Sequence, residues 1–117
     1  MSNIKDNEIL ALVDAAKDGF TKAYAPYSNF HVGAAALTVN GNIVKGCNVE
    51  NASYGLTVCA ERNCLAQGVI SGEQAFSAIV IYTNQDKLTP PCGACRQVIV
   101  EFLAPEALVM AVNHNND

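Results

Sequence analysis

The segment from Phe76 to Thr83, FSAIVIYT, is a continuous apolar run, much shorter than the ~18 residues of a membrane helix. A strand that faces water on one side alternates apolar and polar residues, whereas a strand covered on both faces does not. The run therefore predicts a strand buried between layers of helices. A chain of 117 residues can form one such core, so we expect a single domain over residues 1–117.

The first part of the chain predicts a helix followed by a β-hairpin. Apolar residues at helical spacing indicate a helix from Asn7 to Tyr24, which ends because Pro26 disfavours helical geometry at the residue before it. Strands are expected at His31–Val39 and Asn42–Cys47. Asn40-Gly41, between them, is a strong signal for a two-residue hairpin turn.

The remaining segments complete an α/β pattern. Besides the buried strand, we expect a helix at Val58–Val69, a helix at Cys92–Leu103 and a strand at Ala107–Val112, with loops at Asn48–Leu56 and Gln85–Pro91. The order α, β-hairpin, α, β, α, β predicts a mixed sheet with helices packed on it. The last strand–helix–strand unit should be parallel and right-handed. A sharp turn near Pro105 is the alternative, and it would reverse the final strand.

The charge balance excludes some classes of partner. Eleven acids outnumber seven Lys and Arg, for a net charge of −4. A protein that grips nucleic acid usually presents a basic stripe, so no nucleic-acid partner is expected, and no segment predicts a membrane partner. The first residues, MSNIKDNEIL, lack the basic-then-apolar order of a signal peptide, so a cytoplasmic location is the expectation. A small uncharged ligand is compatible with this balance.

Two cysteine segments carry the chemistry: Cys59-Ala60-Glu61-Arg62, and Pro91-Cys92-Gly93-Ala94-Cys95-Arg96. The five cysteines are an odd number, which does not suggest a disulfide framework. Each segment lies at a predicted helix start, where unpaired amides favour the thiolate that metals bind. Three thiolates with one open position form the coordination pattern of a catalytic zinc, whereas structural zinc normally has four protein ligands.

Other readings of these cysteines are simpler. Cys47 and Cys64 are interpreted as small buried hydrophobic residues. Cys64 lies about 140° round the helix from Cys59, and so on a different face. Cys92 and Cys95 alone could form a redox pair or a structural zinc site, so the upstream Cys-x-Glu decides between these possibilities.

Glu61 follows the first of these cysteines by two residues. A ligand-x-Glu segment combined with Pro-Cys-x-x-Cys is the pattern of zinc deaminases, in which the Glu is a general acid and base. Taken alone, Glu61 would more simply be a solvated acid in a first helical turn. Both zinc motifs together favour the catalytic interpretation.

Three long motifs resemble the homotetrameric cytidine deaminase family: YAPYSNFHVGAA (Tyr24–Ala35), GCNVENASYGLTVCAER (Gly46–Arg62) and PCGACRQVIVEF (Pro91–Phe102). The resemblance extends from the first helix to the last strand. It implies a three-layer α/β/α fold and hydrolytic deamination of cytidine or 2'-deoxycytidine. It also implies a zinc ion on Cys59, Cys92 and Cys95, Glu61 as the proton shuttle, and Arg62 donating hydrogen bonds to the thiolates.

The resemblance also implies the substrate contacts. It places Asn48 and Glu50 on the ribose hydroxyls, Phe30 against the pyrimidine ring, and the Ala60 backbone at the edge of the base. An Asn and a Glu together can donate and accept hydrogen bonds to a diol. Simpler interpretations are a turn residue for Asn48, a solvated acid for Glu50 and a core aromatic for Phe30. Tyr54 would reach the site of a neighbouring subunit.

At its end the chain departs from the family pattern. Members usually continue into another strand and a tail that places an aromatic residue over a neighbour's nucleoside, whereas here the last residues are Asn113–Asp117. We expect a homotetramer, with a dimer as the alternative, and a wider tolerance of substituents on N4 unless a neighbouring subunit closes the pocket. His31 and His114 lie outside the zinc motifs and are not expected to bind metal.

Two other functions compete with a nucleoside deaminase. One is a deaminase of modified cytosine nucleosides, either N4-substituted cytidines or blasticidin S. Against the blasticidin type, the stretch Cys47–Asn51 matches nucleoside deaminases better. The other is a non-catalytic, zinc-stabilised binding module, which would have no use for Glu61.

Overall fold

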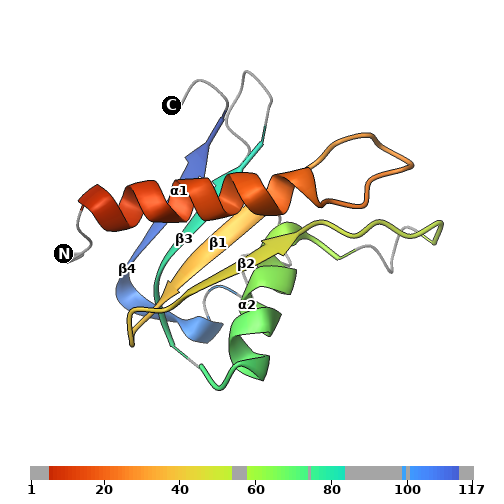
Figure 1. Cartoon of the computed structure of the whole chain (residues 1–117). Coiled ribbons are helices and arrows are strands. Elements are labelled where there is room, and N and C mark those ends of the chain that lie inside the picture. Colours follow the sequence, from red (N-terminus) through yellow and green to blue (C-terminus); the bar gives the residue numbers. More distant parts are fainter. Residues whose placement is uncertain (1–5, 54–57, 74, 84–98, 100, 114–117) are drawn as a thin grey trace.

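The computed structural model of the chain describes residues 6–53, 58–73, 75–83, 99 and 101–113. Its elements follow the α/β order predicted from the sequence (Figure 1). They are α1 (Asp6–Thr21), β1 (Gly33–Thr38), β2 (Ile43–Cys47), α2 (Ala60–Ile70), β3 (Phe76–Tyr82) and β4 (Leu103–Val112). Most of the predicted helix at Cys92–Leu103 lies outside the described residues; Ile99, Glu101 and Phe102 are helical.

The four strands form one mixed sheet in the order β2-β1-β3-β4. β1 is antiparallel to both of its neighbours, and Ala35 pairs with Lys45 on one side and with Val80 on the other. β3 and β4 are parallel, which confirms the predicted direction of the last strand; Pro105 does not reverse it. The apolar run at Phe76–Tyr82 is therefore an interior strand, as its composition predicted.

The two helices α1 and α2 cover opposite faces of this sheet (Figure 1). Side chains alternate along β1: Ala35 and Leu37 join the core beneath α1, while Ala34 and Ala36 join the core beneath α2. This arrangement confirms the three-layer α/β/α fold. The α1-side core comprises Leu12, Ala16, Ala35, Leu37, Ala78, Val80, Tyr82 and Val112. The α2-side core comprises Val32, Ala34, Ala36, Val44, Ala60, Cys64, Leu65, Phe76, Ile79, Ile81 and Ile99.

Both helices approach the β1–β2 hairpin closely, at two glycines. A Cβ on Gly33 would lie 1.9 Å from the carbonyl oxygen of Ala16 in α1. A Cβ on Gly46 would lie 2.4 Å from the backbone nitrogen of Cys64 in α2. Such distances are far inside van der Waals contact, so any side chain at these positions would push a helix away from the sheet. Glycine in β2 therefore determines how near α2 lies to the sheet.

Several boundaries differ from the predictions. α1 ends at Thr21 rather than Tyr24. The hairpin turn is longer than two residues: the Thr38 N–H donates to the Asn42 carbonyl at 2.8 Å, and Thr38 Oγ1 accepts from the Asn42 N–H at 3.0 Å. The prediction of a two-residue turn was wrong because the Thr38 side chain supports a wider loop. β4 begins at Leu103, four residues before the predicted Ala107.

No helix in the part of the chain that the structure describes has both the length and the apolar character needed to cross a membrane.

Candidate active site

The candidate site is centred on the start of α2. Cys59 is the N-cap residue, with the extended backbone typical of that position (φ −74°, ψ 157°), and the helix begins at Ala60. Ala60 is fully buried and Glu61 is only 5% exposed. An ionisable side chain is rarely buried to this degree without a specific environment or function. The structure therefore places Glu61 inside the protein, and the interpretation as a solvated first-turn acid was wrong.

Arg62 lies beside the first predicted metal ligand. Its Nη2 atom donates a hydrogen bond to Cys59 Sγ at 3.7 Å, and the side chain is partly buried. The interpretation of Arg62 as a surface cation is therefore wrong. A guanidinium at this place withdraws charge from sulfur, as hydrogen-bond donors around metal ligands do.

The segment that holds Asn48 and Glu50 is joined to the start of α2 through the backbone. The Val49 N–H donates to the Val58 carbonyl at 2.9 Å, and the Val58 N–H donates to the Val49 carbonyl at 2.9 Å. Val58 immediately precedes Cys59. The predicted ribose-binding residues on either side of Val49 are therefore brought next to the predicted catalytic residues. This pairing also explains why α2 begins at Ala60, since Val58 is engaged in an extended bridge.

Asn48 bonds to the protein main chain through both ends of its amide. Its Oδ1 accepts from the Val32 N–H at 2.9 Å, and its Nδ2 donates to the Phe30 carbonyl at 2.8 Å. The side chain is 7% exposed. Asn48 thus attaches the segment before β1 to the end of β2. These contacts are structural, and they agree with the simpler interpretation of Asn48 as a turn residue.

Glu50 bonds to the turn that follows α1. Its Oε1 accepts from the N–H groups of Tyr27 and Ser28 at 3.0 and 3.1 Å, and its Oε2 accepts from the Ser28 hydroxyl. Hydrogen bonds from Ser28 hold the pKa of the Glu50 carboxyl below its usual value, with smaller contributions from the Tyr27 N–H and His31. The simple interpretation of Glu50 as a solvated acid is incomplete, because its carboxylate organises this turn.

Ser28 is a site residue that the sequence analysis missed. Besides its bond to Glu50, its Oγ accepts from the Phe30 N–H at 3.0 Å. A serine that bonds to the backbone two residues later is a common turn signal, and Ser28 lies shortly after the predicted helix end at Tyr24. The turn at Ser28 could therefore have been predicted from the local sequence. The contact between Ser28 and Glu50 could not, because the two residues are 22 positions apart and no local pattern connects them.

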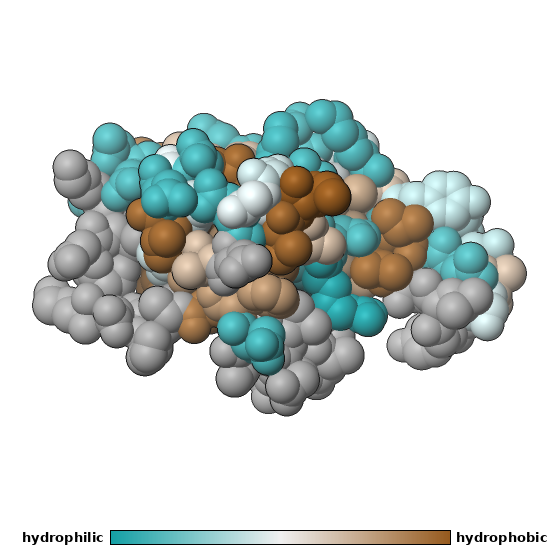
Figure 2. All heavy atoms as spheres, turned by 90° about the horizontal axis from the view of Figure 1, so that it is seen from below, coloured by the Kyte–Doolittle hydropathy of each residue, from teal (hydrophilic) through white to brown (hydrophobic). Residues whose placement is uncertain are grey.

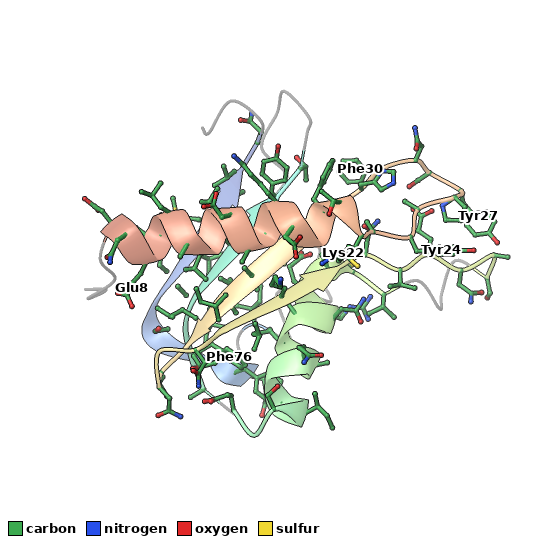
Figure 3. The ribbon with its side chains drawn as sticks, viewed as in Figure 1. Glu8, Lys22, Tyr24, Tyr27, Phe30 and Phe76 are labelled. Carbon is green, nitrogen blue, oxygen red and sulfur yellow. The ribbon has the colours of Figure 1, made fainter. Side chains whose placement is uncertain are left out.

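Phe30 lies with two tyrosines at one end of the molecule. Figure 3 shows Phe30, Tyr24 and Tyr27 on the segment beyond the last turn of α1. Phe30 is half-buried and packs against the α2-side core, whereas Tyr24 and Tyr27 are more than half exposed. One aromatic ring of this segment thus contacts the layer that contains Glu61.

Comparison with known proteins identifies the family. Residues 6–111 match the family described as "Cytidine and deoxycytidylate deaminase zinc-binding region". A cytidine deaminase of Sporosarcina psychrophila is 40% identical over 110 residues, which cover 94% of this chain and 81% of that protein. A "Probable cytidine deaminase" of Dictyostelium discoideum is 46% identical over 100 residues, covering 85% of this chain and 68% of the relative.

Solved structures agree with the sequence comparison. A crystal structure of cytidine deaminase from Burkholderia pseudomallei superposes with a TM-score of 0.88 at 46% identity, covering 97% of this chain and 89% of that one. One from Mycobacterium tuberculosis gives a TM-score of 0.82 at 41% identity, covering 87% and 83%.

The chain belongs to this deaminase family. It is a zinc-dependent deaminase enzyme with the cytidine deaminase fold, as the sequence motifs predicted. The competing prediction of a non-catalytic binding module is therefore wrong.

Of the three predicted zinc ligands, Cys59 falls within the described residues. Cys92, Cys95 and Tyr54 lie outside them, as does His114. Among residues 6–53, 58–73, 75–83, 99 and 101–113, no three His, Cys, Asp or Glu side chains form a metal-binding group. Cys59 fits a thiolate ligand, because it is half-buried and accepts a charge-assisted hydrogen bond from Arg62. Cys59, Cys92 and Cys95 all stay predictions as zinc ligands.

The two remaining described cysteines differ from each other. Cys64 is fully buried, and this burial, together with the nearby Glu61, raises the pKa of its thiol to about 12. It is a protonated core residue, as predicted. Cys47 was expected to be buried but is only half-buried; burial nevertheless raises its pKa, and its Sγ lies 3.6 Å from the Lys22 carbonyl.

A groove runs along the outer side of α2. Its volume is about 550 Å³, and on the side of α2 seen in Figure 2 hydrophobic residues lie exposed among polar ones. Ile70 is 81% exposed. The groove is lined by Arg62, Ala66, Val69, Ile70, Gly72 and Phe102. This lining is largely apolar, and the predicted substrate contacts Asn48 and Glu50 are not part of it.

Proposed function

We propose that this enzyme hydrolyses cytidine and 2'-deoxycytidine to uridine and 2'-deoxyuridine, releasing ammonia. The observation that carries the proposal is the pair of backbone hydrogen bonds between Val49 and Val58. This pairing joins the segment of Asn48 and Glu50, the proposed ribose-binding residues, to the helix start that carries the buried Glu61 carboxylate, and so supports the proposal. A structural zinc site would need neither.

In this proposal, Cys59, Cys92 and Cys95 hold the zinc ion. When bound, zinc supplies Lewis-acid activation of water near neutral pH. Three thiolates leave a site with excess negative charge, which opposes that activation. Arg62 offsets part of this charge through its hydrogen bond to Cys59 Sγ.

Glu61 is proposed to move the protons of the reaction. Water oxygen forms a bond to C4 of the pyrimidine and the C4–N4 bond breaks. Glu61 takes one proton from the water and delivers it to N3. It then takes the second proton from the hydroxyl on C4 and delivers it to the departing amine, so that ammonia leaves and the C4 carbonyl forms. Because Glu61 is buried, its carboxylate is held in place and shielded from bulk water.

The nucleoside is proposed to lie between the start of α2 and the segment before β1. Phe30 would contact the pyrimidine ring, the Ala60 backbone the edge of the base, and Asn48 and Glu50 the ribose hydroxyls. An amide can make up to four hydrogen bonds, and the two that Asn48 makes with Val32 and Phe30 leave acceptor and donor capacity for a hydroxyl.

We further propose a homotetramer, with a dimer as the smaller alternative, in which Tyr54 reaches a neighbouring site. A domain of this size encloses a substrate poorly by itself. Light scattering tests this assembly: a particle of four chains is expected, and a monomer of 12.4 kDa at working concentration would contradict it.

Ultraviolet assays of zinc-loaded protein test the reaction itself. Cytidine and 2'-deoxycytidine should be converted faster than cytosine, N4-substituted cytidines or blasticidin S. Glu61→Gln should retain zinc and bind nucleoside but lose about 10²–10⁴-fold in kcat. The matched control is Glu101→Gln, which changes an exposed glutamate and should leave kcat unchanged. Turnover of Glu61→Gln near the wild-type rate would refute the proton-transfer role.

Metal analysis tests the ligands. One zinc ion per chain is expected, and single replacement of Cys59, Cys92 or Cys95 by Ala should abolish it. Cys64→Ala should keep the metal, because that thiol is a buried, protonated core group. Loss of zinc from Cys64→Ala, with retention in any of the other three, would overturn the assignment.

A further inference from the structure

The turn at Tyr27–Ser28 determines how the Glu50 carboxylate is presented. A carboxylate has two oxygens and about four acceptor directions. Oε1 uses two of them for the N–H groups of Tyr27 and Ser28, and Oε2 uses one for the Ser28 hydroxyl. One direction on Oε2 is therefore left for a ligand hydroxyl.

Ser28 also contacts the segment that carries the proposed base-stacking ring. Its Oγ accepts from the Phe30 N–H at 3.0 Å while its hydroxyl hydrogen points to Glu50. The same hydroxyl thus connects a group proposed to bind ribose with the backbone of a residue proposed to bind the base. Asn48 reinforces this connection by accepting from Val32 and donating to Phe30.

We infer that Ser28 is a positioning residue for nucleoside binding: its hydroxyl fixes the Glu50 carboxylate so that one acceptor direction faces the ribose. This inference rests on the proposed function, because it requires Glu50 to bind the sugar. Ser28 itself does not touch the reacting atoms. Its removal should weaken substrate binding and leave the chemical step intact.

The charge state of Glu50 supports this inference. An ionised carboxylate accepts hydrogen bonds from hydroxyls, whereas a protonated one loses that capacity in part. Hydrogen bonds from Ser28 hold the pKa of Glu50 low, with smaller contributions from the Tyr27 N–H and from His31. Since the pKa is lowered, binding by the carboxylate is present above it and is lost as the pH falls through it. Without Ser28 this loss should begin at higher pH.

The experiment measures kcat and KM for cytidine in Ser28→Ala, Ser28→Gly, Ser28→Thr and wild type. Removal of the hydroxyl should raise KM about tenfold, the size of one hydrogen bond to a charged group, with kcat within about twofold. Ser28→Thr keeps a hydroxyl and should restore KM. The acidic limb of kcat/KM should move to higher pH in Ser28→Ala and not in Ser28→Thr. Ser71→Ala, which removes an exposed hydroxyl bonded to the Gln67 carbonyl, is the matched control.

Glu50→Gln separates this inference from the function on which it rests. A raised KM in Glu50→Gln with an unchanged KM in Ser28→Ala and Ser28→Gly would overturn the positioning role alone. An unchanged KM in Glu50→Gln would instead remove the proposed ribose contact. A fall in kcat without a rise in KM, or failure of Ser28→Thr to restore binding in a protein with wild-type melting temperature, would also overturn the inference.

Discussion

The two faces of the central sheet are covered in different ways. Beneath α1, Leu12 and Ala16 meet aliphatic residues and Tyr82, and the T-shaped contact between Phe20 and Tyr82 has a centroid distance of 5.2 Å. On the α2 side, the first turn of the helix carries the buried Glu61. Both helices rest on a glycine of the hairpin, Gly33 or Gly46.

This difference indicates that the two faces of the sheet have different roles in the deaminase. The α1-side core contains no carboxylate, thiol or basic side chain among its buried described residues, and its contacts are those of a stabilising layer. On the α2 face, the same kind of packing also determines where a carboxylate and a thiol lie. Changes of equal size on the two faces should therefore have similar effects on stability and different effects on activity.

Replacing two fully buried leucines should give the largest effects and therefore the strongest test of this comparison. Leu12→Ala in α1 and Leu65→Ala in α2 each remove the same side chain from a closed core, so each should cost about 2–5 kcal/mol of unfolding free energy. Only Leu65→Ala should also lower kcat/KM of the folded protein, because it loosens the helix that carries Glu61. Chemical denaturation and the cytidine assay measure the two effects; equal activity losses in both variants would remove the distinction between the faces.

Alanine variants of the two hairpin glycines provide a second pair, with a smaller expected effect on stability. A methyl group at Gly33 would meet Ala16, and one at Gly46 would meet Cys64, so both alanine variants should lose about 1–3 kcal/mol. Gly46→Ala should in addition reduce zinc content and turnover, since it pushes the first turn of α2 away from the sheet. Gly33→Ala should keep one zinc per chain. Full zinc occupancy and normal kcat in Gly46→Ala would show that the site tolerates movement of α2.

Thiol reactivity is the third test and concerns the α2 face alone. Burial raises the pKa of Cys64 to about 12, so its thiolate is scarce throughout the range in which proteins are usually handled. In native protein below about pH 10, Cys64 should not react with an alkylating reagent, and it should react once the chain is unfolded. Mass spectrometry of the labelled peptides locates the modification. Rapid native labelling of Cys64 would contradict the packing of α2 on β2.

The smallest effect is expected on the outer surface of α1. Hydrogen bonds from Lys45 and Lys22 lower the pKa of Asp18 to about 2, at distances of 2.7 and 2.9 Å. Because the folded pKa lies below the ordinary value of 3.8, the stabilisation is present above about pH 4 and is lost as the pH falls toward 2. Asp18→Asn should lower the melting temperature slightly at pH 7 and not at pH 2, with activity unchanged. Asp14→Asn, at an exposed acid of the same helix, should leave the melting temperature unchanged at both pH values.

Much of the architecture was predictable because its signals are local. The apolar run at Phe76–Tyr82, the helical spacing in α1 and the Asn40-Gly41 turn signal each identify an element without knowledge of its partners. The errors lie at element ends, where a partner decides the outcome. Val58 was assigned to α2 but pairs with Val49, and Thr38 widens the hairpin through its side chain.

In the candidate site, too, the features with local signals were predictable and those that depend on distant contacts were not. Cys59 and Glu61 were predicted from their spacing, because a helix start and a short motif lie within a few residues of each other, and the role of Arg62 was implied by the family resemblance. Ser28 was not, since the residue that it holds is 22 positions away. Nor could spacing show that Asn48 bonds to Phe30 and Val32 through its amide.

By itself, the sequence determined which residue types carry the chemistry and which face of each element is apolar, because both depend on chemical identity and short-range periodicity. Only the tertiary structure decided that Glu61 is buried, that Glu50 bonds to the turn at Ser28, and that α2 can approach β2 at Gly46. These features arise when segments far apart in the chain come into contact. Their geometry depends on how closely two backbones pack, which no local pattern encodes.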